Sequence, residues 1–121
     1  MEHTILVVED EQGIREAIGI YLKNQGYNVI LAANGKEGLE KIETNDIHLA
    51  IVDIMMPIMD GYEATLQIRK KDKKIPILAM SANAYMQDIQ KCYKAGMNGH
   101  IAKPINREEL YQMLQHFLQP E

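Results

Sequence analysis

The 121-residue chain alternates short apolar runs of strand length with longer segments in which apolar residues recur at helical spacing. The short runs lie at 5–8, 29–31, 49–52, 77–80 and 100–102. Runs that are apolar throughout, without alternation, are typical of strands buried on both faces, as in a parallel sheet. Strands that alternate with helices are joined by right-handed crossovers, which place helices on both faces of the sheet. Five units are too few for an eight-stranded barrel, so we expect an open α/β sheet.

The segments between these runs carry helix signals. Apolar residues from Ile14 to Leu22 recur at helical spacing, and Gly26 is placed to end that helix. The clearest helix start is Asn106, an N-cap with Glu109 three residues later. Further helices are expected after Asn34, over 62–71 with Leu66 among the apolar positions, and over 86–95 with Ile89, Cys92 and Tyr93 facing inward. The pattern predicts a single (βα)5 domain over residues 1–121.

Composition narrows the classes of function. Thirteen basic residues against seventeen acidic ones give a net charge of −4, which offers no electrostatic reason to expect nucleic-acid binding. The single cysteine, Cys92, cannot form an internal disulfide, which favours a reducing compartment. No apolar run approaches the roughly 20 residues that span a bilayer, and the acidic N-terminal segment does not resemble a signal peptide. We therefore expect a cytoplasmic protein that binds neither nucleic acid nor membrane.

Polar residues directly follow four of the five apolar runs. Glu9 and Asp10 follow the first run, Asp53 the third, Ser81 the fourth and Lys103 the fifth. In an open α/β sheet, ligands bind at the carboxyl ends of the strands. Although these residues lie far apart in the sequence, we expect them to converge there.

The chemistry of this group favours a metal. Three neighbouring carboxylates raise one another's pKa unless a cation lies among them, and oxygen ligands favour a hard cation such as Mg²⁺. With the ammonium of Lys103 and the hydroxyl of Ser81, the group has the parts needed for phosphoryl transfer onto Asp53. Taken singly, Asp10 could be a helix cap, Ser81 a turn residue and Lys103 a surface lysine. Their joint placement at strand ends favours the functional interpretation.

Four segments carry a resemblance to a known family: VVEDE at 7–11, DIMMPIMDG at 53–61, MSANA at 80–84 and HIAKPI at 100–105. In this order and spacing they resemble the receiver domains of two-component response regulators, and most closely those of hybrid histidine kinases. The resemblance covers essentially the whole chain. It implies a flavodoxin-like (βα)5 fold, with a five-stranded parallel sheet in the order 2-1-3-4-5 and helices on both faces.

The resemblance also implies a role for each acidic residue. Asp53 would be the phosphoacceptor. Asp10 would bind Mg²⁺ directly, Glu9 would assist, and the backbone carbonyl of Met55 would be a further ligand.

The remaining positions would serve the phosphoryl group and its loop. Ser81 would donate a hydrogen bond to a phosphoryl oxygen and Lys103 would pair with it. The Lys103–Pro104 peptide bond would be cis, as prolines allow. Pro57 and Gly61 would shape the loop after Asp53.

The function implied is that of a phosphoacceptor signalling domain, which takes a phosphoryl group from a histidine kinase or a histidine phosphotransfer protein. The added charge would shift the fourth and fifth βα units. The family's aromatic switch residue aligns with His100, which is either the switch here or a strand residue without a role. The domain would catalyse only its own phosphorylation and dephosphorylation, as a monomer, with dimerisation on phosphorylation left open.

Three other functions are less consistent with the sequence. A phosphatase of the haloacid-dehalogenase type needs a second aspartate where this chain has Met55. A flavin site needs a Ser/Thr/Gly-rich loop after the first strand, where this chain has the acidic EDEQG. A receiver-like fold kept only for protein binding would not need the full acidic, serine and lysine set.

Overall fold

The computed structural model describes residues 2–56, 59–82 and 86–118; Pro57, expected to shape the loop after Asp53, lies outside them. All five strands are parallel and follow the order β2-β1-β3-β4-β5. The strands are β1 (Thr4–Val8), β2 (Asn28–Ala32), β3 (Leu49–Asp53), β4 (Ile77–Ser81) and β5 (Gly99–Ala102). The helices are α1 (Gln12–Asn24), α2 (Gly35–Thr44), α3 (Gly61–Lys71), α4 (Met86–Ala95) and α5 (Arg107–Phe117). The expected flavodoxin-like (βα)5 fold and its strand order are confirmed.

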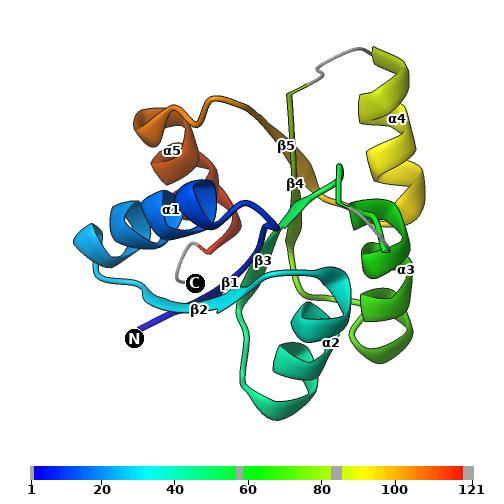
Figure 1. The fold of residues 1–121 in the computed structure, drawn as a ribbon, viewed down its shortest axis with the longest axis horizontal. Helices are drawn as coiled ribbons and strands as arrows, with labels where there is room; N and C mark the ends of the chain where they lie inside the picture. Colours follow the sequence, from blue (N-terminus) through cyan, green and yellow to red (C-terminus); the bar gives the residue numbers. More distant parts are fainter. Residues whose placement is uncertain (1, 57–58, 83–85, 119–121) are drawn as a thin grey trace.

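The sheet separates two helical layers. Figure 1 shows α1 and α5 on one face of the sheet and α2, α3 and α4 on the other. Successive strand residues face opposite layers: Ile5 and Val7 pack with the cluster under α1 and α5, whereas Leu6 and Val8 pack with the cluster under α2 to α4. This two-sided burial explains why the strands are apolar at nearly every position.

Local signals set the helix ends. The side chain of Asn34 accepts a hydrogen bond from the Glu37 N–H at 2.8 Å, and that of Asn106 accepts one from the Glu109 N–H at 3.1 Å. Both caps match the sequence prediction. Gly26 follows the end of α1 with a φ of 87°, a left-handed conformation that suits glycine.

Two apolar side chains lie on the surface instead of in the core. Tyr93, expected to face inward from α4, is 54% exposed, and Leu66 of α3 is 46% exposed. In each helix a smaller set of positions supplies the buried stripe, with Cys92 in α4 and Ile68 in α3. The prediction for Tyr93 is therefore wrong: it lies 100° around the helix from Cys92, where its ring borders a surface groove.

Across the described ranges, every helix is too short or too polar to cross a bilayer.

Candidate functional site

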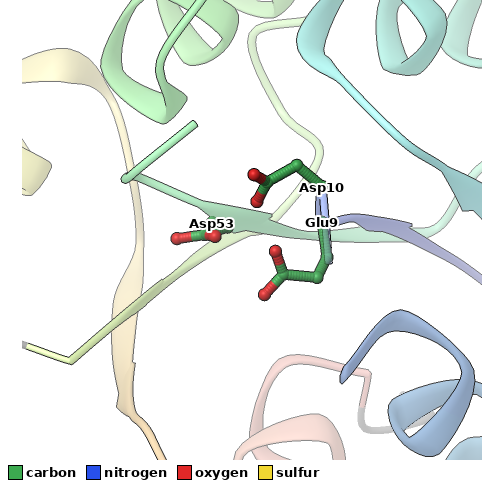
Figure 2. Close-up of side chains that lie close together, drawn as sticks. All are labelled: Glu9, Asp10 and Asp53. Atoms are coloured by element: carbon green, nitrogen blue, oxygen red, sulfur yellow. The ribbon is translucent and has the colours of Figure 1, made fainter. Parts of the chain in front are cut away.

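The carboxyl ends of β1 and β3 bring three acidic side chains together. Glu9 and Asp10 directly follow β1, and Asp53 is the last residue of β3, the strand that pairs with β1. One carboxylate oxygen of each lies within 4.8 Å of the others. Figure 2 shows the three carboxylates converging on one space at the edge of the sheet. The convergence predicted from the sequence is thus present in the fold.

Two of these acids are buried, and one lysine pairs with both of them. Glu9 and Asp53 are almost completely buried, whereas Asp10 is partly exposed. Lys103 Nζ, supplied by the segment after β5, lies 2.7 Å from Glu9 Oε1 and donates a hydrogen bond to Asp53 Oδ2 at 3.1 Å. Burial disfavours the charged ammonium, but the hydrogen bonds and attraction of Glu9 and Asp53 outweigh it and raise the pKa of Lys103. Lys103 therefore stays charged at neutral pH.

The third acid, Asp10, has a raised pKa. The hydrogen bond to Glu9, followed by burial and the negative charge of Glu9, raises its pKa, while its own backbone hydrogen bond and Lys103 act in the opposite direction. Since one ammonium faces three carboxylates, the described cluster has a deficit of positive charge.

The backbone around the acids is held by several hydrogen bonds. Arg15 Nη1 donates to the carbonyl of Glu9 at 2.9 Å and to that of Asp10 at 3.4 Å, so the first turn of α1 supports the acidic turn. The Met55 N–H donates to Asp53 Oδ1 at 3.0 Å, which fixes the orientation of that carboxylate. No pattern in the sequence pointed to a role for Arg15. The feature that could have indicated this role is its position five residues after Asp10, in the first turn of a helix.

Gly61 allows the loop after Asp53 to close tightly. A Cβ at this position would lie 2.6 Å from the carbonyl oxygen of Asp53 and 2.6 Å from the Cα of Ile54. Asp60 caps α3 by accepting a hydrogen bond from the Glu63 N–H at 2.9 Å. The start of α3 therefore packs directly against the end of β3, where only a residue without a side chain fits.

Ser81 ends β4, and Lys103 directly follows β5. Ser81 is buried at the end of β4, one residue beyond the partner of Asp53 in the ladder. The N–H of Lys103 donates to the carbonyl of Ser81 at 2.9 Å, which ties the ends of β4 and β5 together. The Lys103–Pro104 bond is cis, the conformation that the resemblance implied.

His100 lies apart from the acidic cluster. It is half-buried on β5, and its Nε2 atom is buried without a hydrogen-bond partner among the described residues. It lines a groove of about 470 Å³ with Tyr93 of α4 and with Met113 and Phe117 of α5. None of the contacts described around Asp53 involves His100.

The acidic cluster fits a hard divalent cation. Its donors are all oxygens, the set that Mg²⁺ prefers, and they carry three formal negative charges against one from Lys103. The buried Oε1 of Glu9 lies 2.7 Å from Lys103 Nζ and has no further hydrogen-bond partner among the described residues, so it retains a lone pair for a metal. Glu9, Asp10 and Asp53 could hold such an ion. A role for the Met55 carbonyl stays a prediction.

An open cavity of about 490 Å³ borders the loop that follows Asp53. Its described lining joins the loop after β3 to β4 and α4, with Ile54, Met55, Met56, Asp60, Tyr62, Ser81 and Lys91. Met55, which is exposed, and Ser81 border it. The cavity therefore extends from solvent to Ile54, the residue that directly follows Asp53.

Comparison with known proteins agrees with this geometry. A family model described as "Response regulator receiver domain" matches residues 5–115. A "Probable transcriptional regulator ycf29" of Porphyra purpurea is 37% identical over 120 residues, which cover 98% of this chain and 57% of that protein. The chain spans about half the length of several curated relatives that it matches.

Two solved structures are informative. The receiver domain of the sensor histidine kinase PA1611 from Pseudomonas aeruginosa, described with magnesium coordinated in the active site cleft, is similar with a TM-score of 0.90 and 35% identity, covering 99% of this chain and 100% of that one. The receiver domain of Ssk1 from Saccharomyces cerevisiae, co-crystallised with the histidine phosphotransfer protein Ypd1, gives a TM-score of 0.90 and 26% identity over 96% of this chain and 88% of the matched chain. With the family match over residues 5–115 and the acids, serine and lysine at the strand ends, this chain belongs to the response regulator receiver domains.

Proposed function

We propose that this receiver domain accepts a phosphoryl group on Asp53 in a Mg²⁺-dependent reaction. The observation that carries the proposal is the buried carboxylate of Asp53, which lies within 4.8 Å of two further acids and has its Oδ2 on the ammonium of Lys103. Bound Mg²⁺ would supply charge neutralisation for the phosphoryl oxygens.

The donor in this proposal is the phosphohistidine of a histidine kinase or a histidine phosphotransfer protein. An oxygen of Asp53 forms a bond to phosphorus while the bond between phosphorus and the histidine nitrogen breaks, and the imidazole leaves. Lys103 pairs with a phosphoryl oxygen and Ser81 donates a hydrogen bond to another. In dephosphorylation, the oxygen of water forms a bond to phosphorus while the bond between phosphorus and the Asp53 oxygen breaks, and inorganic phosphate leaves. The proposed chemistry is the domain's own phosphorylation and dephosphorylation.

A groove beside Lys103 supports docking of a protein donor. It measures about 260 Å³ and lies between α1 and the segment after β5, lined by Gly13, Ile14, Ala17, Ile18, Tyr21, Lys103, Pro104 and Ile105. Its apolar lining suits the apolar side chains of a partner helix. Because Lys103 belongs both to this groove and to the acidic cluster, a helix docked there could present its histidine to Asp53.

The proposed output is a change in the fourth and fifth βα units. A phosphoryl group adds nearly two negative charges beside Lys103, which directly follows the fifth strand, and beside Ser81, which ends the fourth. His100 on β5 is the candidate switch residue, since its buried Nε2 can gain a partner if α4 or α5 moves. We place this signalling in the cytoplasm, where the thiol of Cys92, the single cysteine of the sequence, stays reduced.

Mass spectrometry of the intact protein tests the proposal. With Mg²⁺ and a small phosphodonor such as acetyl phosphate, we expect the mass of one phosphoryl group to be gained. EDTA and the Asp53→Asn variant should both abolish this gain. Asp46→Asn is the matched control, because Asp46 is exposed and lies outside the cluster.

The protein donor is tested separately. A phosphorylated histidine phosphotransfer protein should pass its label to the wild type and not to Asp53→Asn. An undiminished mass gain in Asp53→Asn, or steady turnover of a generic phosphate ester, would contradict the proposal.

A further inference from the structure

Arg69, in the last turn of α3, makes the densest hydrogen-bond set of any described side chain. Nε and Nη2 donate to the carbonyl of Gly96 at 2.9 and 2.8 Å. Nη1 donates to the carbonyls of Ile75 at 2.7 Å and Asp72 at 3.2 Å. Nη2 also donates to Asn98 Oδ1 at 2.7 Å. One guanidinium thus joins the segment before β4 to the segment before β5.

Asn98 extends this connection into the sheet. Its N–H donates to the carbonyl of Ile77 at 2.7 Å, and its Oδ1 accepts from the Ile77 N–H at 2.9 Å. Ile77 is the first residue of β4, and Asn98 directly precedes β5. The pair therefore sets the register in which the two strands begin, and the same ladder ends with Ser81 opposite Ala102.

Arg69 is a charged group whose described hydrogen-bond acceptors are all carbonyl or amide oxygens, and none of them is a carboxylate. Burial lowers the pKa of Arg69, and the attraction of Asp72 only partly opposes this effect. The carboxylate of Asp72 instead accepts hydrogen bonds from the N–H groups of Lys74 and Ile75. A partly buried charge held by carbonyl and amide oxygens is costly, and such groups are best attested where they fix a register.

Gly96 shows how closely the loop fits the arginine. Its φ is 108°, and a Cβ there would lie 3.0 Å from Arg69 Cγ and 3.2 Å from Nε. The loop between α4 and β5 is therefore shaped around the Arg69 side chain.

We propose that Arg69 is a positioning residue for the phosphoryl site at the opposite end of the sheet. Through Asn98 it fixes where β4 and β5 begin, and so places Ser81 and Lys103 level with Asp53. The inference rests on the proposed function. Glu9 and Asp10 directly follow β1 and Asp53 ends β3, and none of the hydrogen bonds described for Arg69 is made to either strand.

The test separates metal binding from phosphoryl acceptance. Arg69→Met, Arg69→Lys and Asn98→Ala are compared with wild type and with Lys70→Met, which removes the same charge from an exposed neighbour on α3. The rate of mass gain from acetyl phosphate is measured at a temperature at which circular dichroism shows each variant to be folded. Calorimetry gives the Mg²⁺ affinity of the same samples.

We expect the phosphorylation rate of Arg69→Met to fall about tenfold or more, since misplacement of a reacting group by 1 Å can cost 10²-fold. Mg²⁺ affinity should stay within about twofold, because none of the three acids comes from β4 or β5, whose starts Arg69 and Asn98 hold. Arg69→Lys, which can satisfy only part of the acceptor set, should fall between wild type and Arg69→Met. If Arg69→Met does not fold, Arg69→Lys and Asn98→Ala decide the question.

Three outcomes would overturn the inference: rates equal to wild type, an equal loss in Lys70→Met, or a parallel loss of Mg²⁺ affinity and phosphorylation. If wild type itself gains no phosphoryl group, the proposed function fails first. If wild type is phosphorylated and the Arg69 variants match it, only the positioning role fails.

Discussion

Replacing Lys103 by methionine removes the ammonium shared by two buried acids. The side chain of Lys103 is 19% exposed, while those of Glu9 and Asp53 are 0% and 2% exposed. Removing one partner of a buried ion pair costs about 3–5 kcal/mol, because the remaining charge is left without compensation. Because the site opens to solvent at Asp10, we expect Lys103→Met to lower the free energy of unfolding by about 3 kcal/mol, the lower end of this range.

Urea unfolding in EDTA, followed by circular dichroism, measures this loss. With a slope of about 1.5 kcal/mol per molar urea, the midpoint of Lys103→Met should fall by about 2 M. Lys36→Met is the control, since Lys36 is an exposed lysine on α2, and its stability should stay within about 0.5 kcal/mol of wild type.

Mg²⁺ adds a second signature. An ion at 100 times its dissociation constant stabilises the folded state by about 2.7 kcal/mol. The gain should be larger in Lys103→Met than in wild type, because the ion replaces the missing positive charge. A variant as stable as wild type in EDTA, within about 0.5 kcal/mol, would refute the view that Lys103 neutralises the buried acids.

Three further predictions concern pH, charge and packing. The pKa of Lys103 is raised above 10.5, so the stabilisation that its ammonium gives the folded state is complete below that pH and is lost as the pH rises through the raised pKa. The urea midpoints of wild type and Lys103→Met should therefore converge in strongly alkaline buffer. The raised pKa of Asp10 means that its ionised form costs stability at neutral pH, so Asp10→Asn should stabilise the metal-free protein by about 0.5 kcal/mol after allowance for solvent screening, and calorimetry should show weaker Mg²⁺ binding. Gly61→Ala should destabilise by about 1–3 kcal/mol in thermal unfolding, because its Cβ would meet the backbone of Asp53 at 2.6 Å; an unchanged melting temperature would mean that the loop can relax.

Much of the fold follows from short-range patterns. The apolar runs predict all five strands, because β1, β3 and β4 are buried on both faces and the edge strands β2 and β5 are partly buried. Asn34 and Asn106 mark helix starts because their side chains satisfy free N–H groups. The convergence of Glu9, Asp10 and Asp53 follows from topology, since parallel strands end at the same edge.

Other features depend on contacts that no local pattern specifies. Tyr93 follows Cys92 by one residue, so periodicity alone could not decide which of the two faces the core. The sequence suggested no role for Arg69, because its acceptors at Gly96 and Asn98 lie 27 and 29 residues away and are carbonyl or amide oxygens. Arg15 was missed for a similar reason, as its partners are backbone carbonyls.

The ammonium of Lys103 is a counter-ion held in common by Glu9 and Asp53, two side chains from different strands. A substitution or modification of one acid therefore changes how strongly the ammonium interacts with the other acid. Substitutions at the two positions should therefore not combine additively, even though 44 residues separate them along the chain. Glu9, Asp53 and Lys103 therefore contribute to stability as one coupled group. A change in the free energy of unfolding measured for a substitution at one of them will depend on the charge of the other two.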